Sequence, residues 1–426
     1  MKKLLIILMT FVCLVLTSCS NNKYTLEDIK GKTYEEALEI LSLHVNVTKE
    51  LVNTAEYYPN TVIDYKNKKA GDKVKEKSTV TLLVSDIPLE SQTFENSIVS
   101  YSKIITKFTG PDSINEEVML EAGLAGCDLG ISIELGDEII YLFGDSFSGE
   151  KRTGLWYSNF IARSTDRLFY DGATFDSIVS RKNGMAKPFA QGAHQENHEE
   201  NNGTEVTKIP TGGIKIGDSV YIFYMSVRYW GPNASWLVNY NQCVKSQDLD
   251  TWEDVSSLRW EEDEAPNFGQ IYPFKDPKSN YIYLYSIPGG RHGGLVVSRV
   301  DINSFEVRDE YEYLVGENTW VKGDEGLKAL LDNPYYINGP KVSEMSVTYN
   351  SYLNKYTLIY SMGGEVLMYE SSTPYDQFTN PVVLFAGPYY GAVTSEALME
   401  DNGKTIYIPL SYWTDYNTYW LQIRFH

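Results

Sequence analysis

Residues 126–147 carry the sequence GCDLGISIELGDEIIYLFGDSF, which has the pattern of a β-hairpin with an aspartate near each end. Two apolar runs flank a Gly136-Asp137 turn, and such a turn between apolar strands is a strong hairpin signal. Asp128 and Asp145 each lie in a predicted turn of small residues at the open end of the hairpin. Because a hairpin brings its ends together, we expect these two carboxylates to face one cavity. Paired carboxylates in a cleft are what glycosidic bond hydrolysis requires.

The second strand of this hairpin recurs along the chain. A turn followed by an aromatic and aliphatic strand occupies residues 136–144, 217–226, 279–286, 353–361 and 403–411. A further strand with a Ser- or Asp-rich turn follows, for example at residues 161–166, 243–252 and 368–372. Five such units predict an all-β fold, a five-bladed β-propeller over residues 97–426. Two β-sandwiches would explain the strands but not the repeat.

In a propeller the inner strands converge on a central channel, so Asp128 and Asp145 of the first blade would share one funnel. Each aspartate also has a purely structural interpretation, since Asp and Gly-Asp are ordinary turn residues. For Asp145 alone that interpretation is the stronger one. The glycines beside both residues favour a functional pair, because glycine lets a ligand approach the backbone.

The N-terminus has the pattern of a targeting segment. Lys2 and Lys3 precede an apolar run from Leu4 to Leu16, and Leu16-Thr17-Ser18-Cys19 resembles a lipoprotein signal box. We therefore predict a signal peptide over residues 1–18 and lipidation of Cys19, which places the protein outside the cytoplasm, anchored to the cell membrane by lipid. The alternative is an ordinary secretory signal with an incidental cysteine.

Residues 23–86 form a separate predicted unit, a helix followed by three short strands. Thr33 and Glu36 make a capping box at the start of the helix. The Ala70–Val74 turn and the final strand at residues 78–85 make this small α+β unit resemble a PASTA domain, although Leu26-Glu27-Asp28 replaces the usual Val-Pro-Asp opening. The resemblance implies a cell-wall context, with peptidoglycan as a possible partner. The alternative is a plain spacer module.

Composition limits the classes of partner and cofactor. The chain has 426 residues with 37 Lys and Arg against 57 Asp and Glu, a net charge of −20, which argues against nucleic acid as a partner. Of four cysteines, Cys127 and Cys243 remain in the predicted propeller, either as two buried thiols, which we favour, or as one disulfide. We find no zinc spacing, no nucleotide-binding glycine loop and no nucleophile elbow, so we predict neither a cofactor nor a metal.

Several motifs of the propeller resemble those of one bacterial family. The motifs lie at residues 126–130, 143–147, 209–213, 343–347 and 411–413, in the family's order. The family consists of five-bladed propellers long described as a domain of unknown function, and it includes endo-D-arabinanases, glycoside hydrolases that cut α-D-arabinofuranose chains. The resemblance implies that Asp128 and Asp145 are the catalytic acid/base pair. It also implies an arabinofuranose-containing polysaccharide as substrate.

Which aspartate holds the proton stays open at this point. The separation of the carboxylates, which distinguishes inversion from retention, is also open. We lean towards inversion by analogy with other five-bladed glycosidases.

Other residues are candidates for substrate binding. Glu344 lies where the fourth blade enters the funnel and would bind a sugar hydroxyl or tune the acid, with a strand-edge role as the alternative. Arg291, next to His292 in the glycine-rich segment 288–294, would place a cation over the channel mouth, unless it is simply a solvated surface residue. Aromatic residues at strand ends or in loops would stack on sugars, although core packing is an alternative for Trp413: Trp230, Tyr390, Trp413 and Tyr416.

His194 belongs to a polar segment, residues 191–200, that we expect to line the cleft. His194 and His198 are four positions apart with a glutamate between them, which suggests a metal site. The order differs from the His-Glu-x-x-His motif, and nearby Asn and Gly favour a loop over a helix, so we prefer the cleft-lining role.

Two functions remain in competition. The first is a cell-surface glycoside hydrolase that cleaves α-arabinofuranosidic linkages by carboxylate acid/base catalysis. The alternative is a non-catalytic, cell-wall glycan-binding lipoprotein that is tethered by the same architecture and uses its many aromatic residues for binding.

Overall fold

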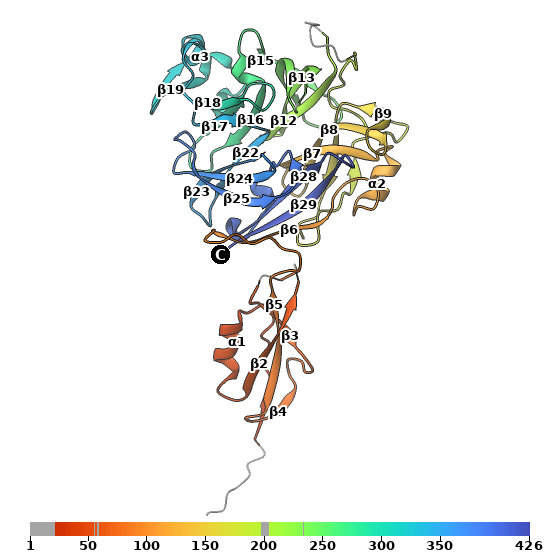
Figure 1. Cartoon of the computed structure of the whole chain (residues 1–426), viewed down its shortest axis with the longest axis vertical. Coiled ribbons are helices and arrows are strands. Elements are labelled where there is room, and N and C mark those ends of the chain that lie inside the picture. The colour runs from red at the N-terminus through yellow and green to blue at the C-terminus, as the bar shows by residue number, and fades with distance from the viewer. Residues whose placement is uncertain (1–21, 55, 58, 197–203, 233) are drawn as a thin grey trace, which may run out of the picture. The chain divides into compact units, whose positions relative to one another are not determined.

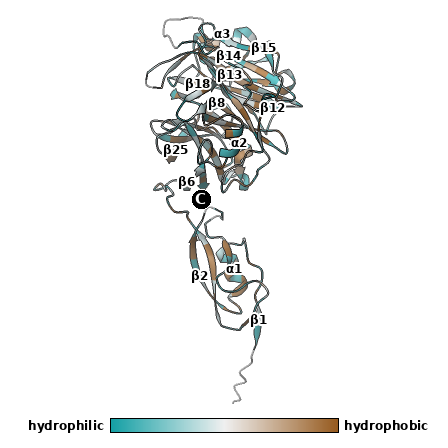
Figure 2. Cartoon of the chain, turned by 90° about the vertical axis from the view of Figure 1, so that its right-hand side faces the viewer, coloured by the Kyte–Doolittle hydropathy of each residue, from teal (hydrophilic) through white to brown (hydrophobic). Residues whose placement is uncertain are grey.

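The computed structural model describes residues 22–54, 56–57, 59–196, 204–232 and 234–426. The predicted signal peptide, the lipidation site Cys19 and His198 lie outside these residues. The chain forms two compact units, one ending at Leu89 and one that spans Glu90–His426 (Figure 1). Figure 2 shows hydrophobic residues along the strands of both units.

The smaller unit contains the predicted helix and three strands. Helix α1 (Tyr34–Leu41) begins at the capping box, in which the Glu36 amide donates to Thr33 Oγ1 and the Thr33 amide donates to the Glu36 carboxylate. Strands β2 (Asn46–Asn53), β5 (Thr79–Asp86) and β3 (Val62–Tyr65) form a sheet in that order, with β2 and β5 parallel. A ribbon of β1 (Lys23–Thr25) and β4 (Lys73–Lys75) was not predicted.

The larger unit consists of five antiparallel sheets, each with four or more strands. Their strands run as follows. The first sheet has β7 (Gly126–Glu134), β8 (Ile139–Gly149), β9 (Thr153–Tyr157), β10 (Phe160–Ser164) and β11 (Ser177–Ile178). The second has β12 (Thr207–Ile216), β13 (Ser219–Trp230), β14 (Trp236–Ser246) and β15 (Glu253–Glu261). The third has β16 (Gln270–Lys275), β17 (Tyr281–Ile287), β18 (Gly293–Asp301), β19 (Glu312–Gly316), β20 (Thr319–Lys322) and β21 (Asn338–Val342).

The fourth sheet has β22 (Met345–Asn350), β23 (Lys355–Met362), β24 (Glu365–Ser371) and β25 (Thr379–Ala386). The fifth has β26 (Tyr389–Tyr390), β27 (Met399–Glu400), β28 (Thr405–Tyr412), β29 (Asn417–Phe425) and β6 (Val99–Lys107). Short helices lie between strands: α2 (Glu116–Glu121), α3 (Gly323–Asp332), η1 (Pro266–Phe268), η2 (Ile302–Ser304), η3 (Arg308–Glu310), η4 (Glu396–Leu398) and η5 (Asp401–Gly403).

The five sheets are the blades of a propeller. Strand β7 lies beside β12, β12 beside β16 and β16 beside β22, while β28 of the fifth blade returns to β7. The predicted five-bladed β-propeller is therefore confirmed. The repeat found in the sequence corresponds to the second strand of each blade, namely β8, β13, β17, β23 and β28.

The ring closes through a strand that the repeat did not predict. Strand β6, at the start of the unit, pairs with the C-terminal strand β29, so that Ser102 lies opposite Ile423. This pairing makes β6 the outermost strand of the fifth blade and joins the beginning of the unit to its end. Beside this closure the buried ring of Phe108 packs against Trp420 and Tyr141, with centroids 4.8 and 5.4 Å away.

Both cysteines of the propeller are free and buried. The favoured interpretation of two buried thiols therefore holds, and the alternative of a Cys127–Cys243 disulfide is wrong. Within the described ranges, no helix combines the length and the apolar character needed to cross a membrane.

Candidate active site

The two aspartates lie in paired strands and not in the predicted turns. Asp128 belongs to β7 and Asp145 to β8, but the register between these strands shifts on both sides of Leu129. Leu129 has a φ of 70°, a conformation that costs on the order of 1–3 kcal/mol, and its amide donates to Ser411 Oγ at 2.8 Å. Bulges of this kind re-aim a side chain. The small residues that predicted a turn at Asp128 therefore mark a β-bulge in β7.

Gly144 lets the Asp128 carboxylate approach the backbone of β8 closely. A Cβ atom at this position would lie 2.5 Å from Asp128 Oδ1, which is closer than real contacts allow. The Asp128 carboxylate therefore rests against the backbone of the residue directly before Asp145.

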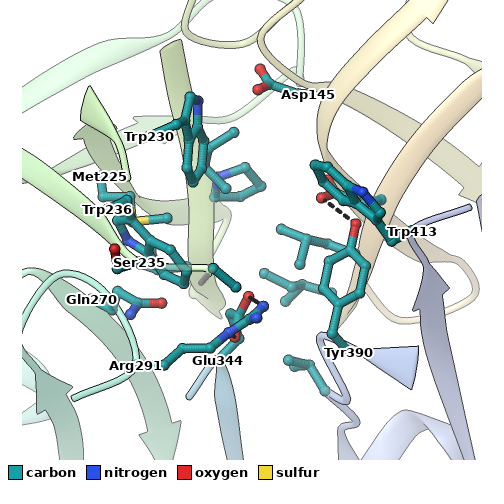
Figure 3. Close-up of a pocket in the computed structure, with 18 of the residues that line it drawn as sticks. Asp145, Met225, Trp230, Ser235, Trp236, Gln270, Arg291, Glu344, Tyr390 and Trp413 are labelled. Carbon is teal, nitrogen blue, oxygen red and sulfur yellow. Dashed lines mark hydrogen bonds and ion pairs between the residues drawn. The ribbon is translucent and has the colours of Figure 1, made fainter. Parts of the chain in front are cut away.

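Both aspartates line one cavity of about 630 Å³. Its walls come from all five blades, and Figure 3 shows side chains from opposite sides facing a common space. The cavity collects eight of the nine residues predicted for catalysis and substrate binding: Asp128, Asp145, Trp230, Arg291, Glu344, Tyr390, Trp413 and Tyr416. The ninth, His194, lies behind its wall.

Asp145 is the more deeply placed acid, with 7% of its surface exposed. Its Oδ1 accepts hydrogen bonds from Trp156 Nε1 at 2.7 Å and from the Thr207 hydroxyl. Burial, with a contribution from the neighbouring Asp128, raises the pKa of Asp145 to about 8, although the hydrogen bonds from Thr207 and Trp156 act in the opposite direction. This carboxyl can therefore hold a proton near neutral pH.

Asp128 has a different environment. Its Oδ2 accepts a 3.0 Å hydrogen bond from the Tyr390 hydroxyl, while its buried Oδ1 has no hydrogen-bond partner among the described residues. Burial, with a smaller contribution from Glu344, raises the pKa of Asp128 to about 7. The phenols of Tyr390 and Tyr416 and the positive charge of Arg291 act in the opposite direction.

A third carboxylate of the cavity is already paired. Arg291, in the β17–β18 loop, donates to both oxygens of Glu344, from Nε at 2.9 Å and from the terminal nitrogen at 2.6 Å. The guanidinium lies over the rings of Trp236 and Tyr390, 5.2 and 5.4 Å from their centroids. A bidentate pair held between two rings is geometrically fixed, so Arg291 and Glu344 present a rigid polar floor (Figure 3).

Aromatic rings form two opposite walls of the cavity (Figure 3). Trp230 and Trp236 meet edge to face on one wall, and Tyr390 and Trp413 do so on the other, with centroids 5.7 and 6.4 Å apart. Trp413 is 58% exposed, so the core-packing alternative for this residue is wrong. Arg152 lies 4.0 Å over the Trp413 ring and donates to its carbonyl oxygen, which orders this exposed rim.

His194 supports the site from behind. Its imidazole stacks on Trp156 at 3.9 Å, and its Nε2 lies 2.9 Å from Ser158 Oγ. Burial lowers the pKa of His194, which favours the neutral ring. The expectation that His194 lines the cleft is therefore wrong, because Trp156 stands between it and Asp145. Within the described ranges, no cluster of His, Cys, Asp and Glu is arranged to hold a metal ion.

Several residues of the site were not anticipated from the sequence. They line the cavity or hold its acids: Arg152, Trp156, Thr207, Met225, Trp236 and Gln270. Thr207 begins β12 of the second blade, and no local pattern links it to Asp145 of the first. Trp156 lies in β9, which pairs with β8, the strand of Asp145, but no pattern in the sequence marked this residue.

Comparison with protein families gives a match for each of the two units. A family model described as a domain of unknown function (DUF4185) matches residues 113–422, and a PASTA domain model matches residues 24–86. A comparison with curated protein sequences finds no significant match.

Comparison with solved structures gives further matches. A protein from Bacteroides ovatus ATCC 8483, described provisionally as a hydrolase, is 16% identical with a TM-score of 0.51, covering 71% of this chain and 86% of its own. The native arabinanase of Bacillus subtilis is 12% identical with a TM-score of 0.41, covering 71% and 96%. An exo-β-1,3-galactanase from Phanerochaete chrysosporium is 9% identical with a TM-score of 0.43, covering 75% and 64%. The Bacteroides ovatus protein shares the fold of this chain, and an identity of 16% shows nothing beyond the fold.

Proposed function

The chain belongs to the DUF4185 family, and on that premise we propose that its propeller is a glycoside hydrolase that cleaves α-arabinofuranosidic linkages in a polysaccharide. One observation carries the proposal. Two neighbouring carboxyls, Asp128 and Asp145, face one aromatic-walled cavity, and the pKa of each is raised towards neutrality.

The chemistry follows from the coupling of the two acids. Glycoside hydrolysis needs one protonated carboxyl to give a proton to the leaving oxygen and one ionised carboxylate on the other side of the bond. Two acids that share a buried site do not ionise together, because the first charge disfavours the second. Near neutral pH the pair therefore holds one proton, which is the state that hydrolysis uses.

The remaining cavity residues fit a neutral sugar chain. The guanidinium of Arg291 is paired with Glu344, so this pair offers hydrogen bonds to sugar hydroxyls and little net charge to an acidic sugar. The rings of Trp230 and Trp413 lie on opposite walls, where apolar sugar faces can stack (Figure 3). A furanose polymer passing between these walls would present its linkage to the two aspartates.

The N-terminal part of the chain supports a cell-envelope location. The PASTA unit suits an extracellular protein that contacts the cell wall, with peptidoglycan as its proposed partner. The lipoprotein signal ending at Cys19 would anchor the protein to the outer side of the membrane. We therefore propose a surface-tethered enzyme that meets its polysaccharide outside the cell.

A panel of furanose polymers tests this function. The protein lacking residues 1–18 is incubated with D-arabinan, L-arabinan and a galactofuranan, and new reducing ends and product sizes are followed. We expect oligosaccharides of mixed length from D-arabinan, the pattern of internal cleavage. If none of the three polymers yields product over a long incubation, the proposal is contradicted.

A glycan-binding protein without catalytic activity is the second candidate. The exposed Trp413 ring, ordered by Arg152, and the PASTA unit favour it, since both suit tethered binding. Saturable binding of a polymer in the same panel, without new reducing ends, would select this candidate.

A further inference from the structure

A loop between β11 and β12, at residues 190–195, packs against both groups that donate to Asp145. We propose that His194, in this loop, is a positioning residue of the active site, which acts through Trp156 by holding its indole N–H on Asp145. This role rests on the proposed function, since the orientation of Asp145 matters to the reaction only if that acid takes part in it. His194 does not line the cavity, so it acts without touching the substrate.

Trp156 is held by its own strand along one edge only. Strand β9 pairs with β8, where Trp156 lies opposite Phe147, and no other described strand pairs with it. The three residues before Trp156 are exposed. Pairing along one edge fixes the backbone of Trp156 but not the rotation of its indole. A further contact must therefore decide whether Nε1 reaches Asp145 Oδ1, which lies 2.7 Å away.

His194 supplies that contact. Its imidazole lies face to face with the Trp156 indole, with ring centroids 3.9 Å apart and planes 6° apart, whereas the Phe147 ring is 5.9 Å away. A ring stacked this closely blocks rotation of the indole, because rotation would drive one ring into the other. The φ of His194 is 51°, which is uncommon for a residue with a side chain. Such conformations persist where the surroundings hold them, and they cluster at active sites.

Hydrogen bonds fix the imidazole in its neutral form. The Gly192 amide donates to Ser158 Oγ, so the hydroxyl hydrogen of Ser158 is free to donate to His194 Nε2, 2.9 Å away. Gln191 Nε2 donates to the Gly192 carbonyl oxygen and lies 3.0 Å from the same His194 nitrogen. With two donors facing it, Nε2 is an acceptor, and the proton is on Nδ1. Burial lowers the pKa of His194, and only the Glu205 carboxylate acts in the opposite direction.

The same loop lies against the second donor, Thr207. A Cβ atom at Gly192 would come within 2.7 Å of Thr207 Cα, so the two backbones are in close contact. Asn159, which follows β9, ties the loop to the second blade, since its side-chain nitrogen donates to the carbonyl oxygens of Ala190 and Lys208 at 2.7 and 3.0 Å. The loop is therefore anchored to both blades where their donors reach the acid.

Loss of His194 should act on Asp145 at a distance. Without the stacked ring the indole can turn away, and Asp145 then loses a donor that lowers its pKa. The carboxylate also loses one of the two bonds that fix its orientation. We expect the chemical step to slow, because a misplacement of about 1 Å can cost roughly 10²-fold. Binding of the sugar chain should change little, because His194 lies outside the cavity wall.

A double-mutant cycle tests whether His194 acts through Trp156. The protein lacking residues 1–18 is assayed on D-arabinan, and we expect His194→Ala to lower kcat by roughly 10–10²-fold with KM little changed. Trp156→Phe should cause a similar loss. Adding His194→Ala to Trp156→Phe should then cost no more than about twofold, because the two residues act as one unit. Losses that multiply in the double variant would overturn the proposal, as would full activity of His194→Ala.

Two further variants separate stacking from a general effect on folding. His44 is the matched control, because it also stacks on an aromatic ring, that of Tyr24 at 4.2 Å, while the residues that line the cavity all belong to the larger unit. His44→Ala should keep the kcat and KM of the wild type. His194→Phe keeps a ring on Trp156 and should recover part of the kcat that His194→Ala loses. Equal losses in the two His194 variants would contradict the stacking role.

Nuclear magnetic resonance tests the inference without any substrate. The eight tryptophans give indole N–H signals, and that of Trp156 is identified by its absence from Trp156→Phe. In His194→Ala this hydrogen should exchange with solvent at least about tenfold faster, since its hydrogen bond is no longer held, and carbon-13 titration should show a higher pKa for Asp145. An unchanged Trp156 signal would overturn the proposal even if activity fell. Inactivity of the wild type on every furanose polymer would instead contradict the proposed function, so the two failures are distinguishable.

Discussion

The Asp128 carboxylate lies against the backbone of Gly144, where a Cβ atom would come within 2.5 Å of Oδ1. A Gly144→Ala substitution should therefore displace Asp128 while leaving the strand intact, since Gly144 does not have a positive φ. We expect a loss of activity of about 10²-fold, the effect of a misplacement of roughly 1 Å. Steady-state kinetics with the most active polymer would measure it.

The matched control is Gly316→Ala, because a Cβ there would meet only Thr319, at 3.6 Å. Its activity should equal that of the wild type. If Gly144→Ala is as active as the wild type, the close approach of Asp128 to the Gly144 backbone is not needed for activity.

The Arg291–Glu344 pair makes a prediction about stability. Both side chains are largely buried, so Arg291→Met should leave an uncompensated carboxylate and lower the free energy of unfolding by about 3 kcal/mol. The double variant Arg291→Met with Glu344→Gln should recover much of that loss. Urea unfolding of the single and double variants measures the coupling, and additive effects would show that the pair is not a unit.

The raised pKa values also predict how stability depends on pH. In the folded protein Asp128 and Asp145 keep their protons up to pH values of about 7 and 8. In the unfolded chain they lose these protons near the ordinary aspartate pKa of 3.8. Between these limits the folded state holds more protons, so stability falls as pH rises from about 4 to 8. Each unit of raised pKa corresponds to about 1.4 kcal/mol.

Removing one acid should reduce that slope. We expect Asp145→Asn to be more stable than the wild type at pH 8, by at least about 1 kcal/mol, and little different at pH 4. The control Asp137→Asn lies in the exposed β7–β8 turn and should follow the wild type at both pH values. Identical pH slopes for wild type and Asp145→Asn would contradict the raised pKa of this acid.

The rim aromatic Trp413 should act on binding and not on stability. Because its ring is 58% exposed, Trp413→Ala should change the free energy of unfolding by less than about 0.5 kcal/mol. Loss of sugar stacking should weaken polymer binding by about 1 kcal/mol, or roughly fivefold. Isothermal titration with an inactive Asp128→Asn background measures it, with exposed Leu155→Ala as the control. Unchanged affinity would remove Trp413 from the binding surface.

The sequence predicted the blades because the second strand of each one carries a local and repeated pattern. Strand β6 was not predicted, because its partner β29 lies more than 300 positions away in the sequence. Pairing over such a distance leaves no local pattern. The Asp128–Asp145 pair was found because a single hairpin holds both residues. The sequence predicted turns at these residues, whereas the structure has a bulge in β7, because bulges and turns use the same small residues.

The supporting groups were missed for a related reason. Thr207 and Tyr390 bind the acids from other blades, so only the closed ring brings them into contact. His194 has the composition of a cleft residue, but the strand that carries Trp156 stands in front of it. Contacts between blades are therefore the part of the site that sequence patterns cannot supply.

The central claim is that Asp128 and Asp145 together cleave a furanosidic bond. The most direct measurement is reducing-end release from D-arabinan by wild type, Asp128→Asn and Asp145→Asn, with unfolding temperatures as the check on folding. We predict product from the wild type and a loss of at least about 10²-fold in each folded variant. Undiminished release by both variants would contradict the claim.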